Sequence, residues 1–221
     1  MKAKTIGLLG LGSKSTLFYI EALNAAYSKQ NEEQNTLPLH LLNTNFNKIN
    51  NLLPKPSKEL EGIIQNYLNE LIKLGVTEII IPNITLHETI DRLNVSIPII
   101  HPVHHTASEI VNKMHNNVVL FGSEYTMESN YIKSIFKEYN IATIAPSKED
   151  RAFIDVVRKQ VYQKTASKDL LDRFNLMIKK YAQNSAVVIA CTELSVASTN
   201  SSRSIFDMVR IQIREGLKTT S

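Results

Sequence analysis

Short apolar runs alternate with longer stretches of helical periodicity along nearly the whole chain. Apolar runs bounded by turn residues favour buried strands, and apolar residues three and four positions apart favour amphipathic helices. Each helical stretch is long enough to lead from one parallel strand to the next. The pattern therefore predicts an α/β protein whose parallel sheets are flanked by helices. The expected strands are 6–9, 39–42, 78–81, 97–100, 117–121, 142–145 and 186–190, and two of the expected helices are 149–163 and 206–217.

The chain also contains an internal repeat. Gly12-Ser-Lys-Ser-Thr16 matches Gly122-Ser-Glu-Tyr-Thr126, which begins 110 residues later, and the strand that leads to Asn83 matches the strand that leads to Cys191, 108 residues later. Two motifs in the same order at nearly the same offset indicate two pseudo-symmetric α/β domains. We expect one domain from 1–99 plus 203–221 and a second from 100–202. Symmetry would place the loops at 83 and 191 on opposite sides of one active-site cleft between the domains.

Composition narrows the class of protein. The 221 residues include a single cysteine, which excludes an intramolecular disulfide and suits a reducing, cytoplasmic compartment. The net charge is +4, but the lysines and arginines are scattered and no basic block is interleaved with aromatic residues. We therefore expect anionic small molecules as ligands and no nucleic acid. No apolar run reaches the roughly 18 to 20 residues that a membrane helix needs, so no membrane span is expected.

The single cysteine, Cys191, follows directly on the predicted strand 186–190. Ligands of open parallel sheets bind at the carboxyl ends of the strands. A thiol in that place is a candidate nucleophile or acid/base, and the amides of the turn together with Thr192 would favour its thiolate form. The alternative is a small buried hydrophobe, which is the commoner role of a lone cysteine.

A glycine-rich turn follows the first strand and meets neither of the two nucleotide-binding motifs that it resembles. A dinucleotide fingerprint needs a third small residue after Gly10 and Gly12, and a phosphate loop needs a lysine directly after its second glycine, where Ser13 stands. We expect this turn instead to donate backbone N–H groups to a carboxylate, with Ser15 capping the helix that follows.

The histidines do not indicate a metal site. His101, His104 and His105 are grouped, but Pro98 and Pro102 break regular ligand spacing and no second cluster joins them. No lysine stands at a recognisable phosphate cup for pyridoxal phosphate. We therefore expect neither a metal nor an organic cofactor.

Four threonines stand in strand-end turns, namely Thr16, Thr85, Thr126 and Thr192. Each alone is compatible with an ordinary turn or cap residue. Together, their hydroxyl and amide donors would suit a cradle for a carboxylate.

Three segments resemble the aspartate/glutamate racemase superfamily, and the resemblance covers nearly the whole chain. They are Cys191-Thr-Glu-Leu194 after a strand, Pro82-Asn-Ile-Thr-Leu-His87 after the matching strand, and Gly122-Ser-Glu-Tyr-Thr126 between them. The resemblance implies two pseudo-symmetric α/β domains, a homodimer, and catalysis without pyridoxal phosphate. It also implies one catalytic cysteine on each domain, facing the α-carbon of an amino acid.

The resemblance assigns roles to individual residues. Cys191 matches the second catalytic cysteine, and Thr126 matches a substrate-binding threonine. Thr85 and His87 match the threonine and histidine that follow the first catalytic cysteine. The candidate catalytic residues are Cys191, Thr85, His87 and Asn83, and the candidate substrate-binding residues are Gly10, Gly12, Ser13, Asn43, Ile84, Ser123, Thr126, Thr192, Glu193 and Lys164.

The sequence departs from the resemblance at the first catalytic cysteine. Asn83 stands in its place, and Ile84 stands where an asparagine usually binds substrate. Inverting an α-carbon without a cofactor requires a base on one face and an acid on the other, and an amide side chain serves as neither. The chain thus keeps one half of a two-base mechanism.

Three functions remain open on the sequence. The leading one is a racemase or epimerase of a small acidic amino acid (aspartate or glutamate), in which Thr85, His87 or a water replaces the missing thiol. The second is a lyase or decarboxylase that uses Cys191 alone on a malonate-like acid, as in the related arylmalonate decarboxylases. The third is a non-catalytic binder of dicarboxylates. Lys48, Lys164 and Lys168 are the candidates to pair with a distal carboxylate.

Overall fold

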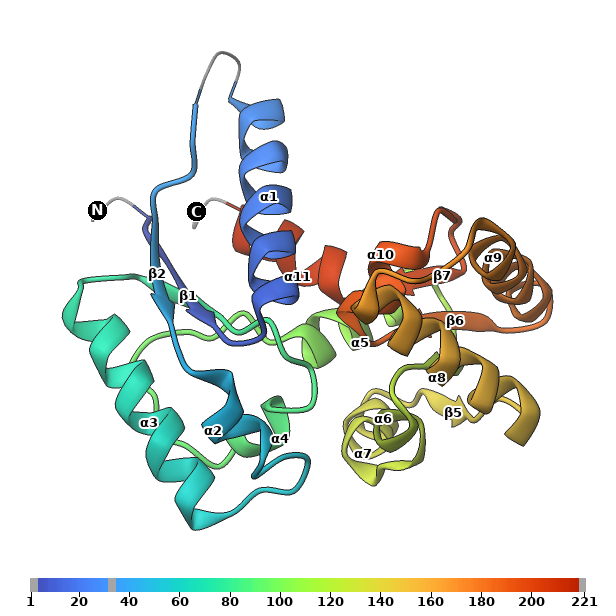
Figure 1. The fold of residues 1–221 in the computed structure, drawn as a ribbon, viewed down its shortest axis with the longest axis horizontal. Helices are drawn as coiled ribbons and strands as arrows, with labels where there is room; N and C mark the ends of the chain where they lie inside the picture. The colour runs from blue at the N-terminus through green and yellow to red at the C-terminus, as the bar shows by residue number, and fades with distance from the viewer. Residues whose placement is uncertain (1–3, 32–34, 219–221) are drawn as a thin grey trace. The chain divides into compact units, whose positions relative to one another are not determined.

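The computed structural model describes residues 4–31 and 35–218, so both outer ends of the first predicted domain lie outside the described residues. The chain divides into two compact units. Unit 1 comprises Met1–His101 with Gln212–Ser221, and unit 2 comprises Pro102–Ile211. Each unit contains a parallel sheet with helices packed against it (Figure 1). The predicted fold class, α/β with two parallel sheets flanked by helices, is confirmed.

Unit 1 is built on a parallel sheet with the strand order β2-β1-β3. Its strands are β1 (Ile6–Gly10), β2 (Leu39–Asn43) and β3 (Glu78–Ile80), and its helices are α1 (Ser13–Gln30), α2 (Phe46–Asn50), α3 (Lys58–Lys73) and α4 (His87–Ile90). The central strand β1 is buried along its whole length, as expected for a strand covered on both faces. Figure 1 shows α1 and α3 on opposite faces of this sheet.

Helix α3 shows how the sequence sets the unit 1 core. Ser57 caps the helix by accepting a hydrogen bond from the Leu60 amide at 3.2 Å, and Gly75, with φ of 82°, ends it. Its buried leucines and its buried isoleucine repeat at helical spacing and pack with Ile79 and Ile81 in one cluster. Each fully buried leucine or isoleucine contributes about 1.5 to 3 kcal/mol. This stripe fixes α3 against β3 and so positions the loop that follows β3.

Unit 2 is built on a parallel sheet with the strand order β5-β4-β6-β7. The strands are β4 (Asn117–Phe121), β5 (Ala142–Ile144), β6 (Ala186–Ile189) and β7 (Ile205–Asp207). The helices are α5 (Pro102–Asn112), α6 (Glu124–Glu128), α7 (Asn130–Glu138), α8 (Lys148–Gln163), α9 (Lys168–Ala182), α10 (Thr192–Ala197) and α11 (Met208–Gly216), the last of which ends in unit 1. Residues of β4, β6, α8, α9 and α10 share one buried apolar cluster.

The two sheets share one topology. In each, the first strand of the unit is central, the second strand pairs on one side of it, and the third pairs on the other. Strands β3 and β6 are therefore equivalent, and so are the loops that contain Asn83 and Cys191. The fourth strand, β7 in unit 2, corresponds in unit 1 to a single parallel bridge between Ile79 and Ile99.

Three elements differ from the sequence prediction. The expected strand 97–100 is reduced to that single bridge, because Pro98 has no N–H to donate to a ladder. Phe206 lies in β7 and not in the last helix, which begins at Met208. Helix α5 was not predicted, and it begins at Pro102, since proline suits the first position of a helix. Because β7 pairs with β6, unit 2 extends past the predicted boundary at 203 to Ile211.

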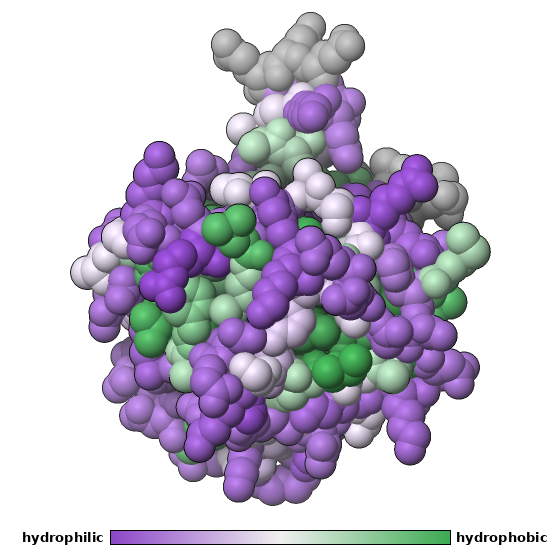
Figure 2. All heavy atoms as spheres, turned by 90° about the vertical axis from the view of Figure 1, so that its right-hand side faces the viewer, coloured by the Kyte–Doolittle hydropathy of each residue, from purple (hydrophilic) through white to green (hydrophobic). Residues whose placement is uncertain are grey.

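The face shown in Figure 2 is mostly hydrophilic, and its hydrophobic residues lie in small separate groups. Among the helices of residues 4–31 and 35–218, none is both long and apolar enough to cross a membrane.

Candidate active site

The two loops that follow β4 and β6 start side by side. These strands pair in parallel with Phe121 opposite Ile189, and the Ala190 amide donates to the Phe121 carbonyl at 2.7 Å. The first loop begins with Gly122, where a Cβ would lie 2.8 Å from the Thr126 methyl carbon. Only glycine fits this close approach. The carboxyl edge of the unit 2 sheet thus brings the Gly122–Thr126 turn next to Cys191.

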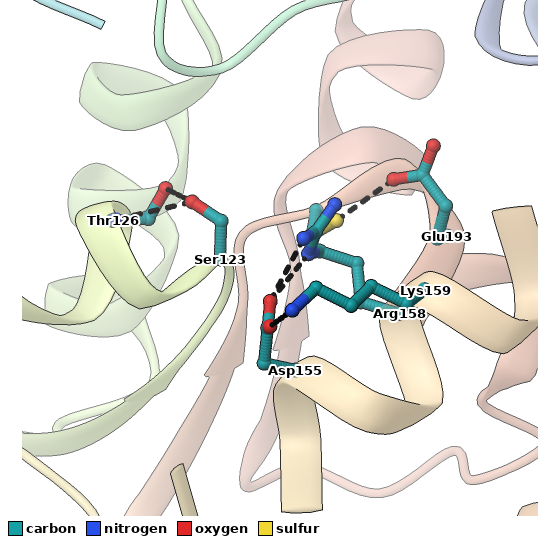
Figure 3. A network of polar contacts seen from close by, with 7 residues as sticks. Ser123, Thr126, Asp155, Arg158, Lys159 and Glu193 are labelled. Carbon is teal, nitrogen blue, oxygen red and sulfur yellow. Dashed lines mark hydrogen bonds and ion pairs between the residues drawn. The ribbon is translucent and has the colours of Figure 1, made fainter. Parts of the chain in front are cut away.

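Ser123 and Thr126 form one hydrogen-bonded pair in that turn. Ser123 Oγ accepts from the Thr126 amide at 3.2 Å, which caps α6, and the two hydroxyl oxygens lie 2.8 Å apart. Thr126 is buried, whereas Ser123 is half-buried. Figure 3 shows the pair beside the loop that bears the thiol. One of the two hydroxyls can therefore donate to a ligand while the other holds it in place.

Cys191 stands at the N-cap position of α10, and its thiol is hydrogen-bonded to another side chain. Sγ donates a hydrogen bond to Glu193 Oε2 at 2.9 Å, seen in Figure 3 as the dashed line from Glu193 to the sulfur atom. The side chain packs against the buried cluster of unit 2. Burial, then the charge of Glu193 and its hydrogen bond, raise the pKa of the Cys191 thiol well above its ordinary value, and they outweigh the amides of Leu194 and Glu193.

The resting Cys191 is therefore a protonated thiol, and the sequence-based expectation of a thiolate is wrong for this structure. The turn amides favour the anion as expected, but burial of the thiol and the carboxylate of Glu193 outweigh them. A thiol hydrogen-bonded to a carboxylate is poised to lose its proton to that carboxylate or to give it to a carbanion.

A buried polar group holds α10 in place. Ser195 donates to Asp207 Oδ2 at 2.5 Å, and Asp207 Oδ1 accepts from the amides of Val209 and Arg210 at the start of α11. Burial raises the pKa of Asp207, while its hydrogen bonds from Ser195 and Arg210 oppose that shift. Asp207 thus ties the helix that follows Cys191 to the next helix of the chain.

The equivalent loop of unit 1 uses Asn83 differently. The side-chain oxygen Oδ1 of Asn83 accepts a hydrogen bond from the Leu86 backbone amide at 3.0 Å. The backbone N–H of Asn83 donates to the Ile81 carbonyl at 2.8 Å. The side chain therefore closes the turn before α4. It is half-buried, and among residues 4–31 and 35–218 no group accepts from its Nδ2, which leaves that group as a donor.

His87 is sealed inside unit 1. It has no exposed surface, and its Nδ1 lies 2.8 Å from the Asn83 carbonyl oxygen. Burial, together with His101 at a ring distance of 4.7 Å, lowers the pKa of His87 to about 3. The ring is neutral at physiological pH, donates from Nδ1 and holds the backbone of position 83. A side chain without exposed surface does not reach a ligand, so the role of His87 is to hold the loop through its hydrogen bond to the Asn83 carbonyl.

The glycine turn of unit 1 packs as tightly as its counterpart. A Cβ on Gly10 would lie 2.8 Å from Asn43 Oδ1 and 3.1 Å from the Thr16 methyl carbon. Thr16 Oγ1 accepts from the Leu11 amide at 3.1 Å. The structure thus brings Gly10, Thr16 and Asn43 together at the carboxyl ends of β1 and β2.

The expected capping role of Ser15 is wrong. The N-cap of α1 is Gly12, which has no side chain to cap with, and Ser15 Oγ donates to the Gly12 carbonyl at 2.9 Å. Ser13 is the first residue of α1 and is exposed. The first N–H groups of α1 therefore lack a side-chain acceptor from this turn.

The remaining predicted residues lie in different environments. Ile84 is buried, and Thr85 and Thr192 are half-buried. Lys164 ends α8 in a left-handed conformation with φ of 59°, which turns the chain toward α9. The three lysines proposed to pair with a distal carboxylate, Lys48, Lys164 and Lys168, are all exposed.

Sequence reasoning missed a charged cluster on α8. Asp155 Oδ1 binds both Nε and Nη2 of Arg158 at 2.8 Å, and Asp155 Oδ2 binds Lys159 Nζ at 2.7 Å. Burial disfavours the charged form, but the two cations outweigh it and hold the pKa of Asp155 below its ordinary value. Figure 3 draws the cluster between the Ser123–Thr126 pair and Glu193. The i, i+3 and i, i+4 spacing was the available signal, but such pairs usually lie on a solvated helix face.

The chain matches the model of the Asp/Glu/hydantoin racemase family over residues 8–216. It belongs to that family. The family and the predicted superfamily resemblance agree, and the chain is an enzyme of the isomerase class.

Solved structures share the fold of this family member. A Yersinia pestis protein described as a candidate Asp/Glu racemase is 23% identical, with 96% of this chain and 97% of that chain covered and a TM-score of 0.83. An aspartate racemase homologue from Pyrococcus horikoshii is 20% identical, with 97% of each chain covered and a TM-score of 0.81. The aspartate racemase of Picrophilus torridus is 20% identical, with 99% and 96% covered and a TM-score of 0.76. At these identities the likeness concerns the fold.

Proposed function

We propose that the chain is a cytoplasmic, cofactor-independent amino-acid racemase or epimerase that acts on aspartate or glutamate through Cys191, and that it works as a homodimer. The observation that supports this most strongly is the 2.9 Å contact between Cys191 Sγ and Glu193 Oε2. It gives the only thiol of the chain a carboxylate to exchange its proton with. The family match and the aspartate racemases among the structural relatives favour an acidic amino acid.

The proposed proton transfer uses this pair in both directions. Glu193 takes the proton of the Cys191 thiol, and the thiolate then removes the α-proton of the substrate, leaving its electron pair on the α-carbon and carboxylate. In the reverse step the protonated thiol gives its proton to the carbanion. Burial raises the pKa of Cys191, which brings it closer to that of the weak carbon acid and favours the donating step.

The neighbouring donors stabilise the negative charge that develops on the substrate carboxylate. Ser123 and Thr126 supply hydroxyls from the turn after β4, the strand that pairs with the one before Cys191, and α10 begins at Thr192 directly after the thiol. Donors fixed in place before the reaction stabilise charge without reorganising, which is commonly the largest contribution to catalysis.

A one-sided reaction is the second candidate, and the unit 1 loop favours it. The side-chain oxygen of Asn83 accepts a hydrogen bond from the Leu86 amide, and His87 is buried and neutral. Neither exchanges a proton with a substrate at neutral pH. Of the predicted substitutes for the missing thiol, Thr85 or a water remains for the racemase. A lyase or decarboxylase that protonates a carbanion from one face needs no second group.

Product analysis separates these functions. Purified protein is incubated with L- and D-aspartate, L- and D-glutamate and phenylmalonate, and the products are resolved by chiral chromatography and by CO₂ release. Inversion of aspartate or glutamate that EDTA leaves unchanged supports the racemase. CO₂ release without inversion would replace it with the decarboxylase, and dicarboxylate binding without turnover would replace it with the binder.

A further inference from the structure

The Asp155 cluster on α8 has an unused hydrogen-bonding edge. Asp155 occupies Nε and one N–H of Nη2 of Arg158. Within residues 4–31 and 35–218, no other group bonds to the Arg158 guanidinium, so Nη1 and the second Nη2 hydrogen are available. That edge is the planar pair of donors that binds a carboxylate with two parallel hydrogen bonds. Asp155 fixes its orientation in advance.

The position of α8 places this edge at the candidate active site of unit 2. Helix α8 contacts both α6 and α10, the two short helices that start directly after β4 and β6. Ile154 and Val157 of α8 lie in the same buried cluster as Leu194 of α10, and Cys191 packs against that cluster. Arg158 follows Val157 directly, and Figure 3 draws its guanidinium between Asp155 and the sulfur atom that is hydrogen-bonded to Glu193.

The charges of the cluster suit an anionic ligand. Two cations share one carboxylate, so the cluster keeps a net positive charge beside the negative Glu193. Without this positive charge, a dicarboxylate that approaches the site would only be repelled by the carboxylate of Glu193. The Arg158 side chain is 28% exposed and that of Lys159 is 61% exposed, so Arg158 is the less hydrated and stronger binding group.

We propose that Arg158, oriented by Asp155, binds the side-chain carboxylate of the substrate at the Cys191 site. It thereby selects dicarboxylates over their amides. The proposal rests on the proposed function for the location of the site. It concerns binding, so it is measured separately from turnover. Arg158 is a binding residue, and Asp155 is a positioning residue that acts through it.

The test is titration calorimetry of the full chain with L-aspartate, D-aspartate, succinate and, as the uncharged match, L-asparagine. Arg158→Gln should lower the affinity for aspartate and succinate by about 10- to 100-fold, as expected for a charged hydrogen bond. The affinity for asparagine should stay unchanged. Arg158→Lys should retain part of the affinity. Asp155→Asn should give a smaller loss than Arg158→Gln, because it keeps the cation and removes its orientation.

Arg151→Gln is the matched control. Arg151 lies on the same helix and pairs with Glu128 at 2.7 Å, whereas Asp155 pairs with Arg158 and Lys159. It should change aspartate affinity by less than about 2-fold. If Arg158→Gln is unstable, Arg158→Lys tests the same contact. It keeps the positive charge and removes only the bidentate hydrogen bonding of the guanidinium.

The outcomes separate this proposal from the proposed function. Equal aspartate affinity in Arg158→Gln and wild type, or equal losses for aspartate and asparagine, would overturn the role of Arg158. Failure of the wild type to bind any dicarboxylate would overturn it as well. Wild-type binding that depends on Arg158, without any inversion or exchange, would support Arg158 and reject the racemase.

Discussion

The loops after β3 and β6 occupy equivalent places in two sheets of the same topology, yet their chemistry differs. After β6, Cys191 donates its thiol proton to Glu193. After β3, Asn83 turns its carbonyl oxygen to the Leu86 amide, and His87 holds the same turn from a fully buried position. Equivalent topology therefore fixes where a functional residue can stand without fixing that it is functional.

The difference also has a structural reason. An asparagine oxygen accepts a backbone hydrogen bond at the start of a short helix better than a thiol does. Position 83 has thus the residue that best closes its turn, whereas position 191 has a poor cap and an acid/base partner. We infer that proton transfer is concentrated in unit 2. The following predictions are ordered from the largest expected effect to the smallest.

Removing the thiol should have the largest effect. Cys191→Ala is expected to lower α-proton exchange by about 10²- to 10⁴-fold, because it removes the proton-transferring group. The rate is followed by NMR in D₂O. Cys191→Ser, which keeps the shape but has a much less acidic hydroxyl, should be nearly as slow. Activity that survives in both variants would move the chemistry away from unit 2.

Acid should destabilise unit 1 through His87. Its pKa is about 3 in the folded state and about 6.5 when unfolded, so the unfolded state binds more protons between these values. The free energy of unfolding should therefore fall as pH drops from about 6.5 to about 3, by a few kcal/mol in total.

Urea unfolding of wild type and His87→Asn at pH 7, 5 and 4 measures this dependence. The variant should be less stable at pH 7 and should lose less stability on acidification. His40→Gln is the control, because His40 is exposed. Equal acid sensitivity of wild type and His87→Asn would show that His87 is protonated without cost.

Glu193→Gln should change labelling and turnover in opposite directions. It removes the charge and the hydrogen bond that help to raise the pKa of Cys191, while burial still raises it. Iodoacetamide should therefore react faster with the variant than with wild type at pH 8. Proton exchange should fall by about 10- to 100-fold, because the thiol loses its acceptor. Slower labelling in the variant would contradict the role of the Glu193 charge.

Asn83→Cys should sharpen the comparison from the other side. It would place an acid/base in the unit 1 loop and should raise aspartate inversion by about 10-fold or more, below the full range of acid/base catalysis because the thiol is not aligned. Losing the Leu86 hydrogen bond should cost about 1 kcal/mol of stability. Chiral chromatography and urea unfolding measure the two effects. Asn83→Ser is the control that keeps an acceptor without adding an acid/base, and Ile84→Asn is combined with Asn83→Cys to restore a donor beside it.

The placement of Cys191 was predictable because it depends on local patterns. An apolar run that ends at residue 190 and a preceding amphipathic helix are enough to place a thiol at a strand end. The same holds for Asn83 and for the two glycine turns. Strand β7 was not predictable in this way, because three residues carry no clear period and only pairing with β6 makes them a strand.

The electrostatics of the site were not predictable from sequence. The expected thiolate failed because the fold buries Cys191 and because the side chain of Glu193 folds back onto it, which depends on a rotamer. Asp155 and Arg158 read as an ordinary surface pair until α8 packs against α10 and buries the carboxylate. Local pattern sets the position of a group, whereas its pKa depends on neighbours that only the fold supplies.

The most direct test of proton transfer concentrated in unit 2 is the rate of α-proton exchange for each enantiomer of aspartate in D₂O, measured by NMR on wild type and Cys191→Ala. We expect exchange that requires Cys191 and is faster for one enantiomer than for the other. Equal rates for both enantiomers, or exchange that persists in Cys191→Ala, would show a second group that transfers protons as well as Cys191 does and would contradict the concentration of proton transfer in unit 2. Absence of exchange in the wild type would contradict proton transfer by Cys191 altogether.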